Sequence, residues 1–411
     1  VSPHGHGLMS GDILVAHELG HNLGTLHANG WECGTGSSFG GDCTSIEYGS
    51  PFDIMGNARY SMRFNAATKD GFSWGTERML QITSSGVYTI NYLEAPTGVP
   101  FARIKNSALD EKIYLEYRRP YGFDSRIGRT DDFLSPSELE NQHGMLVYWL
   151  PRSPNASPLL QPFLLDMTPT SPDWWISLPI DYEHTVLLGG KPGDINYDDA
   201  VTPGDAQLVE AYRTGTGTTA LTDFQQKKAD VNQDGVVTVT DTQCIFDNSL
   251  GKPSCLDQST QVQSWPVFRS EDFGMQLGPV LNVASSSITF SVNLFAPQCV
   301  RRVPRVAPFA GDYFAGGQIS ISFFISNNDG FACGPSNFVV ENIIYPASWS
   351  LAGNGGQLSI DPIPVRDIMA IQLTVPSSTP LGEYKVSFQV KNVSSGMATT
   401  KTVPVRIIGS Q

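Results

Sequence analysis

A chain of 411 residues has room for roughly two to four domains. Its composition, with 40% hydrophobic and only 16% charged residues, 40 glycines and 28 prolines, is more typical of β-rich extracellular modules than of a cytosolic helical protein. The net charge of −14 argues against a nucleic-acid partner, because phosphate binding needs a basic face, and it is compatible with bound calcium. Apolar runs such as GMLVYWLP at 144–151 have the length of a strand, so no membrane span is expected.

The first predicted element is a helix in the stretch from Asp12 to His27, DILVAHELGHNLGTLH. Residues four apart lie on one face of a helix, so His17 and His21 can present their imidazoles to one metal ion. Gly24 ends the helix, because glycine adopts the left-handed conformation of a sharp reversal without steric cost, and the reversal brings back His27. Three neutral nitrogens around an open fourth position are typical of a catalytic zinc site.

Three further residues complete the predicted site. Glu18 lies one position further round the helix, where its carboxylate can reach a zinc-bound water and act as general base without binding the metal. The segment YGSPFDIMG at 48–56 places Met55 in a tight turn, which would supply an apolar floor beneath the imidazoles. Tyr60, five residues after Met55, is a candidate hydrogen-bond donor to the oxyanion.

These motifs, HELGHNLGTLHA, YGSPFDIMG and FNAATKDGFSW at 64–74, resemble the gametolysin family of metzincin endopeptidases, in which Met55 would form the Met-turn. IYLEYRRPYGFD at 113–124 and LLDMTP at 164–169 are similar to the β-domain that follows the peptidase in bacterial members. The resemblance implies a secreted zinc endopeptidase acting on extracellular or cell-wall proteins. Such peptidases carry a β-sheet ahead of the zinc helix, and only sixteen residues precede His17, so the chain is expected to be a fragment.

Residues 79–192 alternate short apolar runs with turn signals, including VYTINYL, KIYLEYR and GMLVYWL. This period-two pattern, broken by Gly, Pro and Asn, predicts an antiparallel β-sandwich.

Two twelve-residue segments, DINYDDAVTPGD at 194–205 and DVNQDGVVTVTD at 230–241, match the calcium-loop frame. That frame has oxygen donors at positions 1, 3, 5, 9 and 12 and a main-chain carbonyl at position 7. The predicted ligands of the first loop are Asp194, Asn196, Asp198, Thr202 and Asp205, with the carbonyl of Ala200. Those of the second are Asp230, Asn232, Asp234, the carbonyl of Val236, Thr238 and Asp241. The second loop has Gly235 at its sharp turn, whereas the first has Asp199, which is expected to weaken that site.

Each loop leads into a short helical run, and the duplication, repeated after 36 residues, resembles a type I dockerin. The resemblance implies a cohesin partner; the alternative is a calcium-rigidified spacer. Loop positions 10 and 11 hold Pro203-Gly204 and Val239-Thr240, where cellulosomal dockerins tend to have hydroxyl pairs. Aspartate at position 12 has a shorter reach than glutamate, so we expect calcium dissociation constants of about 10⁻⁵ to 10⁻³ M.

From about residue 262 onward, GQISISFFISNND, IMAIQLTVP and GEYKVSFQVKNVSS again alternate apolar and polar residues between turns. The pattern resembles an immunoglobulin-like sandwich, for which we expect a spacer or attachment role.

The cysteines fall in three close pairs. Six cysteines allow fifteen connectivities, but each pair lies within its own predicted module, which favours local disulfides and an oxidising compartment. The pairs are Cys33 with Cys43, Cys244 with Cys255, and Cys299 with Cys333.

The sequence therefore predicts a mostly β, multidomain protein. The predicted modules are the C-terminal portion of a metzincin catalytic domain at 1–78, an accessory β-sandwich at 79–192, a dockerin-like module at 193–260 and an immunoglobulin-like sandwich at 261–411. The predicted function is that of a secreted or cell-surface zinc endopeptidase with one catalytic Zn²⁺, two structural Ca²⁺ and a protein or glycoprotein substrate. The alternative is a non-catalytic, calcium-stabilised adhesion or scaffold protein with a vestigial zinc site. An intact Glu18 favours the enzyme, since a binding module has no use for a general base.

Overall fold

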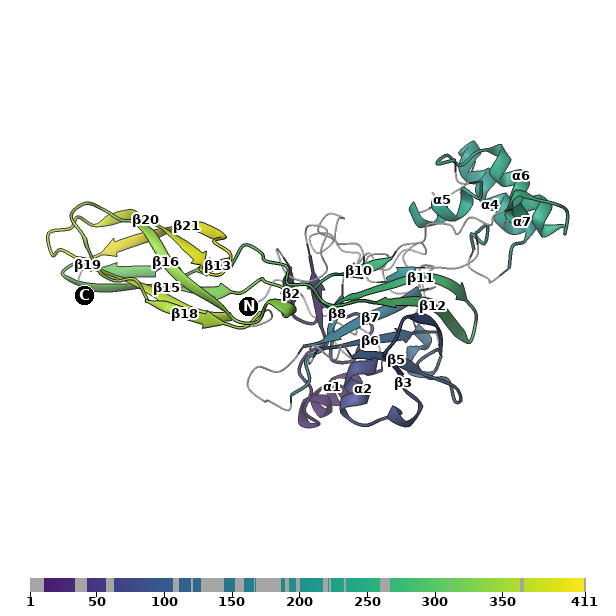
Figure 1. The fold of residues 1–411 in the computed structure, drawn as a ribbon, viewed down its shortest axis with the longest axis horizontal. Coiled ribbons are helices and arrows are strands. Elements are labelled where there is room, and N and C mark those ends of the chain that lie inside the picture. Colours follow the sequence, from purple (N-terminus) through teal and green to yellow (C-terminus); the bar gives the residue numbers. More distant parts are fainter. Residues whose placement is uncertain are drawn as a thin grey trace. The chain divides into compact units, whose positions relative to one another are not determined.

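The computed structural model divides the chain into two compact units, the first made of residues 1–32, 45–269 and 275–295 and the second of 33–44, 270–274 and 296–411. Far more of the described residues lie in strands than in helices (Figure 1), which confirms the predicted mostly β, multidomain class. The structure describes residues 11–33, 43–56, 63–105, 111–119, 121–126, 144–151, 159–165, 167, 186–188, 192–196, 200–216, 221, 223–232, 234–258, 267–309, 311–362 and 366–409.

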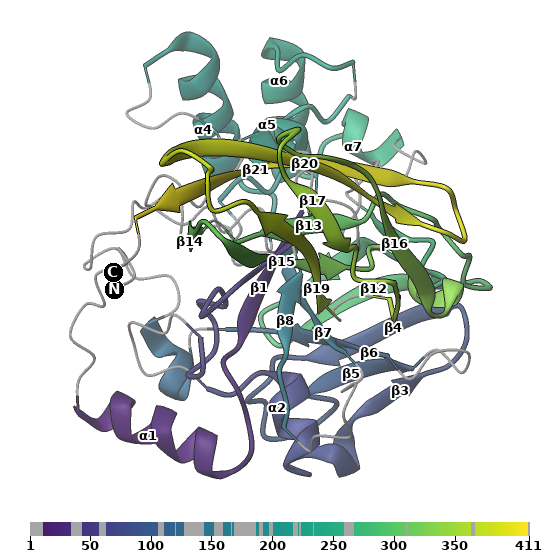
Figure 2. The ribbon, with the colours of Figure 1, turned by 90° about the vertical axis from the view of Figure 1, so that its left-hand side faces the viewer.

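The first unit is built on an eight-stranded sheet with the order β2-β1-β8-β7-β6-β5-β3, in which β9 also pairs with β7. Every residue of β7, and all of β6 after its first residue, are buried, and other elements pack on these strands. One of these is helix α2 (Ala66–Gly71), which packs on β6 and β7 (Figure 2). The strands are β1 (Asn29–Glu32), β2 (Thr44–Ile46), β3 (Leu80–Ile82), β5 (Phe101–Lys105), β6 (Lys112–Tyr117), β7 (Gly144–Leu150), β8 (Phe163–Leu165) and β9 (Val186–Leu188).

A second sheet in this unit joins strands that are about 200 residues apart in the sequence. Its order is β10-β11-β12-β4, and its strands are β4 (Gly86–Asn91), β10 (Phe268–Ser270), β11 (Met275–Val283) and β12 (Ser287–Leu294). Strands β4 and β12 are antiparallel, with Ile90 opposite Ile288 and Tyr88 opposite Phe290. The predicted boundaries are therefore corrected here: β11 and β12, which we assigned to the module at 261–411, complete the sheet that begins with β4. The helical segment is an insertion between these strands.

The helices of this insertion are α4 (Pro203–Thr214), α5 (Asp223–Ala229), α6 (Val239–Ser249) and α7 (Cys255–Gln258). Helices α4 and α6 lie side by side (Figure 2). Their small core follows the sequence duplication, since Ile195 and Val209 of the first repeat have their counterparts, 36 residues later, in Val231 and Ile245. The two halves of the module therefore bury equivalent side chains.

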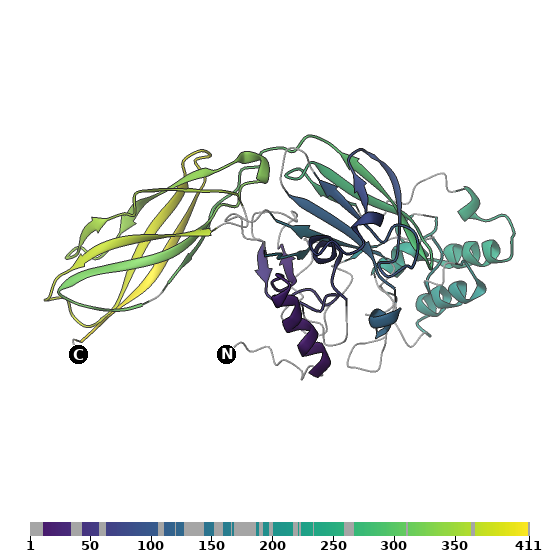
Figure 3. The same ribbon diagram turned by 90° about the horizontal axis from the view of Figure 1, so that it is seen from below.

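The second unit contains a β-sandwich (Figure 3). Along its long strands β15, β19 and β20, buried residues alternate with more exposed ones. One sheet has the order β13-β15-β19-β17 and the other β14-β21-β20-β16-β18. Their inward side chains share one core, in which the ring centroids of Phe323 and Phe388 lie 4.5 Å apart. The strands are β13 (Arg305–Pro308), β14 (Gly311–Phe314), β15 (Gly317–Ser326), β16 (Ser336–Ile344), β17 (Ser350–Gly353), β18 (Gln357–Ile360), β19 (Arg366–Val375), β20 (Gly382–Asn392) and β21 (Ala398–Ile408). Short 3-10 turns occur at η1 (Thr76–Arg78), η2 (Gly122–Arg126) and η5 (Phe331–Cys333).

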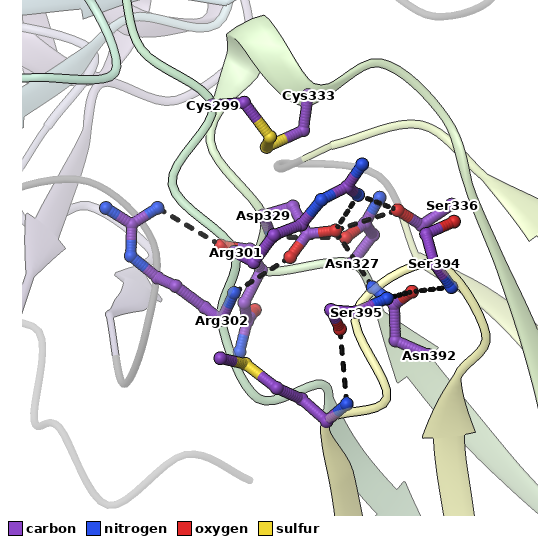
Figure 4. Close-up of polar contacts among 12 residues, drawn as sticks. Cys299, Arg301, Arg302, Asn327, Asp329, Cys333, Ser336, Asn392, Ser394 and Ser395 are labelled. Atoms are coloured by element: carbon purple, nitrogen blue, oxygen red, sulfur yellow. Dashed lines mark hydrogen bonds and ion pairs between the residues drawn. A yellow bond between two sulfur atoms is a disulfide. The ribbon is translucent and has the colours of Figure 1, made fainter.

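All six cysteines are paired as predicted. The disulfides join Cys33 to Cys43, Cys244 to Cys255, and Cys299 to Cys333. The last of these links the start of the C-terminal sandwich to η5, beside a cluster of polar side chains (Figure 4).

At the centre of that cluster is a buried carboxylate, Asp329 (Figure 4). Its Oδ2 accepts hydrogen bonds from Arg301 Nη1 at 2.7 Å, Ser336 Oγ at 2.7 Å and Asn392 Nδ2 at 2.9 Å. Its Oδ1 accepts the N–H of Arg302 at 2.8 Å. Burial alone would raise the pKa of Asp329, but these donors outweigh it and hold the pKa below its ordinary value. The carboxylate thus ties together three separate segments of the sandwich.

We expect Asp329→Ala to lower the free energy of unfolding of this sandwich by about 3–5 kcal/mol at neutral pH, because it leaves buried donors without their acceptor. Since the pKa is depressed in the folded state, the stabilisation is complete above the ordinary carboxyl pKa of about 3.9 and is lost as the pH falls through the lower folded-state value. Scanning calorimetry of the full chain at pH 7 and pH 2 measures both effects. The exposed Asp361→Ala is the control. A wild-type transition for Asp329→Ala at pH 7 would contradict the assignment.

Candidate functional site

Helix α1 (Gly11–Asn22) begins the candidate site. After it the chain reverses at Gly24, which has φ +97°, a conformation that side chains with a Cβ rarely adopt. The reversal is held by a hydrogen bond from the N–H of Thr25 to the carbonyl of Gly20. The reversal returns the chain along the helix and carries His27 toward the two histidines of α1.

The structure brings His17, His21 and His27 together. One ligand atom of each lies within 4.8 Å of the ligand atoms of the other two. The ring centroids are 4.9 Å, 5.4 Å and 5.0 Å apart for the pairs 17–21, 17–27 and 21–27. Two nitrogens bound to a tetrahedral zinc lie about 3.4 Å apart, so each ring needs to move by less than about 1 Å to share one ion.

Main-chain carbonyls orient the two helical histidines. Nδ1 of His17 lies 2.8 Å from the carbonyl oxygen of Ile54, and Nδ1 of His21 lies 2.9 Å from that of Thr25. A carbonyl can only accept, so in each neutral imidazole Nδ1 carries the proton and Nε2 keeps its lone pair for a metal. This is the outer hydrogen bond that metal-binding histidines usually make.

A carboxylate orients the third histidine. Nδ1 of His27 lies 2.9 Å from Oε1 of Glu47. Burial lowers the pKa of His27 by more than the bond to Glu47 raises it, so the imidazole is neutral at pH 7. In all three histidines the hydrogen bond at Nδ1 favours the tautomer that leaves Nε2 free for a metal.

Met55, the predicted methionine of the turn, packs against α1. Its side chain is fully buried and contacts the helix backbone at Gly20, where a Cβ would lie 2.3 Å from the methionine sulfur. Ile13, Ala28 and Ile54 complete this apolar cluster. A side chain at position 20 would force the helix away from the turn.

Of the two catalytic side chains predicted from the sequence, the structure describes one. Glu18 is exposed on α1, and Tyr60 lies outside the described residues. The sequence analysis missed Tyr48, whose ring centroid is 3.7 Å from that of His27 and whose backbone has φ +61°. Burial, followed by the charges of Glu47 and Glu18, raises the pKa of Tyr48. The sequence does point to Tyr48, because this residue begins the segment that contains the methionine turn.

The two predicted calcium loops are closed by equivalent hydrogen bonds among their described residues. Asp205 accepts the N–H of Ile195 at 2.7 Å and of Thr202 at 2.8 Å, and it caps α4. Its counterpart Asp241 accepts the N–H of Asn232 at 3.2 Å and of Thr238 at 2.8 Å, and it caps α6. The carboxylate at position 12 therefore closes each loop onto the helix that follows it. Asp198 lies outside the described residues.

Asp230 and Asp234 shape the second loop from within. Asp230 accepts the N–H of Asp234 at 3.1 Å and of Gly235 at 2.9 Å, and Asp234 accepts the N–H of Val236 at 3.0 Å. Gly235 has φ +87°, as its sharp-turn position requires.

The first loop also has a lysine next to its first predicted ligand. Nζ of Lys228, a fully buried side chain, lies 3.7 Å from Oδ2 of Asp194, the residue at loop position 1. In the second loop, Asp230 occupies loop position 1. Among the described residues Asp230 has no such ion pair, so the described parts of the two loops have different neighbouring charges.

Comparison with known families identifies one module. Residues 192–246 match the sequence model of the Dockerin type I domain, which confirms the predicted dockerin and supports calcium as its ion. No curated protein matches the chain. No helix among the described residues is long and apolar enough to cross a membrane.

Solved structures are similar only over limited regions. A family 123 glycoside hydrolase from Clostridium perfringens is 14% identical over 25% of this chain and 23% of its own, with a TM-score of 0.19. Native alpha-2-macroglobulin from Escherichia coli is 12% identical over 26% of this chain and 17% of its own, with a TM-score of 0.20. A type I cohesin–dockerin complex from Clostridium thermocellum is 14% identical over 26% of this chain and 99% of the matched chain, with a TM-score of 0.17. The chain spans less than a quarter of the first two proteins, and similarities of this strength indicate no function.

Proposed function

We propose that this chain is a zinc-dependent endopeptidase that carries a dockerin domain. The observation behind the proposal is the group of three histidines, each with Nδ1 bound to an acceptor and Nε2 left for a shared ion. The donor set fits zinc, since three neutral imidazoles leave a fourth position open for water or substrate. The resemblance of the surrounding segments to the gametolysin family points to the same reaction class.

His17, His21 and His27 would hold the zinc, which when bound would lower the pKa of a water molecule and polarise the scissile carbonyl. Glu18 would take the proton from the attacking water and return it to the departing amine. Its exposed position on α1 leaves it accessible to solvent and substrate. Tyr48, a phenol that is protonated at neutral pH and lies against His27, would take the oxyanion-donor role that the sequence suggested for Tyr60.

The remaining modules would place this activity outside the cell. A dockerin domain supports docking to a cohesin, and three disulfides support an oxidising, extracellular compartment. The strand orders of the C-terminal sandwich support an immunoglobulin-like fold, which would act as a spacer or attachment module. The substrate class that fits this setting is extracellular or cell-wall protein.

The test measures metal and activity on the full chain with its disulfides formed. We expect one zinc per chain by elemental analysis, loss of that zinc in His27→Ala, and cleavage of casein or gelatin that 1,10-phenanthroline stops. A chain that folds but takes up no zinc would refute the proposal. It would favour the non-catalytic adhesion or scaffold protein in its place.

A further inference from the structure

A second buried carboxylate lies next to the candidate metal centre. Asp53 is fully buried in the turn that carries Met55. Its Oδ1 accepts the N–H of Met55 at 2.6 Å, and its Oδ2 accepts the N–H of Asn65, the N-cap of α2, at 2.6 Å. One side chain thus fixes the methionine turn from inside and joins it to a helix that packs on the main sheet.

The turn held by Asp53 contacts the histidines on two sides. The carbonyl of Ile54 accepts a hydrogen bond from Nδ1 of His17 at 2.8 Å. The carbonyl of Met55 accepts a hydrogen bond from the N–H of Ala28, the residue directly after His27, at 2.9 Å. Any shift of the turn would therefore move the carbonyl that orients the ring of His17 and the segment before β1 that carries His27.

Asp53 belongs to a buried network of charged side chains. Burial raises the pKa of Asp53 to about 6, although the two N–H donors and the positive charge of Arg118 act to lower it. Glu116, also fully buried, lies in the same network and accepts the N–H of Ala66 at 2.6 Å and Nε of Arg118 at 2.8 Å. Glu116 thus has the same burial and the same neighbouring guanidinium, but the hydrogen bonds it accepts come from Ala66 and Arg118 and not from the methionine turn.

We infer that Asp53 is a positioning residue of the metal centre: its two hydrogen bonds hold the Ile54 carbonyl and the Met55 turn in the register that aims His17 and His27 at one ion. This inference rests on the proposed zinc function. Asp53 does not touch the ion or the substrate, and its effect passes through the turn.

The test compares two isosteric changes, Asp53→Asn and Glu116→Gln, in the full chain. An amide can accept through only one of its two ends, so each variant loses one buried acceptor and gains a donor. We expect Asp53→Asn to weaken zinc binding about tenfold or more, as measured by competition with a chromophoric chelator, and to alter the visible absorption of the cobalt-substituted centre. Glu116→Gln should leave both within about twofold of wild type, even if it lowers the thermal midpoint equally.

The outcomes distinguish the positioning role of Asp53 from the proposed zinc function. Equal losses of zinc affinity in both variants, or no loss in Asp53→Asn, overturn the positioning role while the zinc function stands. A wild-type chain that binds neither zinc nor cobalt overturns both. Should Asp53→Asn not fold, Asp53→Glu and Glu116→Asp replace the pair. These keep the charge and shift the carboxylate by one methylene, and only Asp53→Glu should then change the cobalt spectrum.

Discussion

Replacing Glu18 with Gln should reduce the kcat/KM for peptide hydrolysis by about 10²- to 10⁴-fold, the usual contribution of a general base. The amide keeps the size of the side chain but cannot take a proton from water. Because Glu18 is exposed and points away from the core, the variant should fold normally and keep its zinc. Cleavage of a quenched fluorescent peptide and elemental analysis, performed on the same preparation, measure both properties.

Glu77→Gln serves as the matched control for this variant. Glu77 is also an exposed glutamate of the first unit, with 73% of its side chain accessible, and its ion-pair partner Arg78 lies 3.8 Å away. It should retain wild-type activity. If Glu18→Gln cleaves as fast as Glu77→Gln while both hold zinc, the carboxylate is not the base and the peptidase assignment fails.

Removing calcium should unfold the dockerin helices before it affects either β-rich part of the chain. In the second loop, the carboxylates of Asp230, Asp234 and Asp241 accept hydrogen bonds from the backbone of the same short segment. Without a cation their charges repel one another. Each calcium bound at about 100 times its dissociation constant contributes about 2.7 kcal/mol of stability. A calcium chelator should therefore abolish the ellipticity at 222 nm and the amide-exchange protection of residues 203–249.

Asp241→Ala should reproduce this loss at calcium concentrations that saturate wild type, because it removes both a predicted ligand and the cap of α6. Asp247→Ala, on the same helix and outside the predicted loop, is the control. Protection that is unchanged in chelator would show that the helices need no calcium. Recovery on adding calcium, without added zinc, would separate this site from the histidine centre.

Local spacing carried most of the information about the candidate site. The positions of His17, His21 and Gly24 follow from helix geometry, and the dockerin follows from a duplication visible in the sequence. The three disulfides followed from their closeness within predicted modules. Each of these features depends on residues less than about 40 positions apart, which a sequence pattern can record.

Features that depend on distant pairing could not be predicted. The alternation in β12 indicates a strand, but no periodicity indicates that its partner is β4, on the far side of the dockerin insertion. Glu47 and Tyr48 contact His27 only because β1 and β2 are neighbouring strands of one sheet. The role of Asp53 depends on hydrogen bonds to backbone N–H groups, and every residue except proline has such a group.

The buried side chain of Lys228 leads us to expect that the two loops of the dockerin bind calcium in a fixed order. A cation entering the first loop must approach Asp194 against a positive charge 3.7 Å away, and this loop also lacks the sharp-turn glycine. The second loop has Gly235 at its sharp turn, and among the described residues no cation forms an ion pair with Asp230. As the external calcium concentration rises, the second half of the module should therefore become rigid first and the first half only at a higher concentration. The domain would then respond to its surroundings in two stages, with a half-ordered form between them.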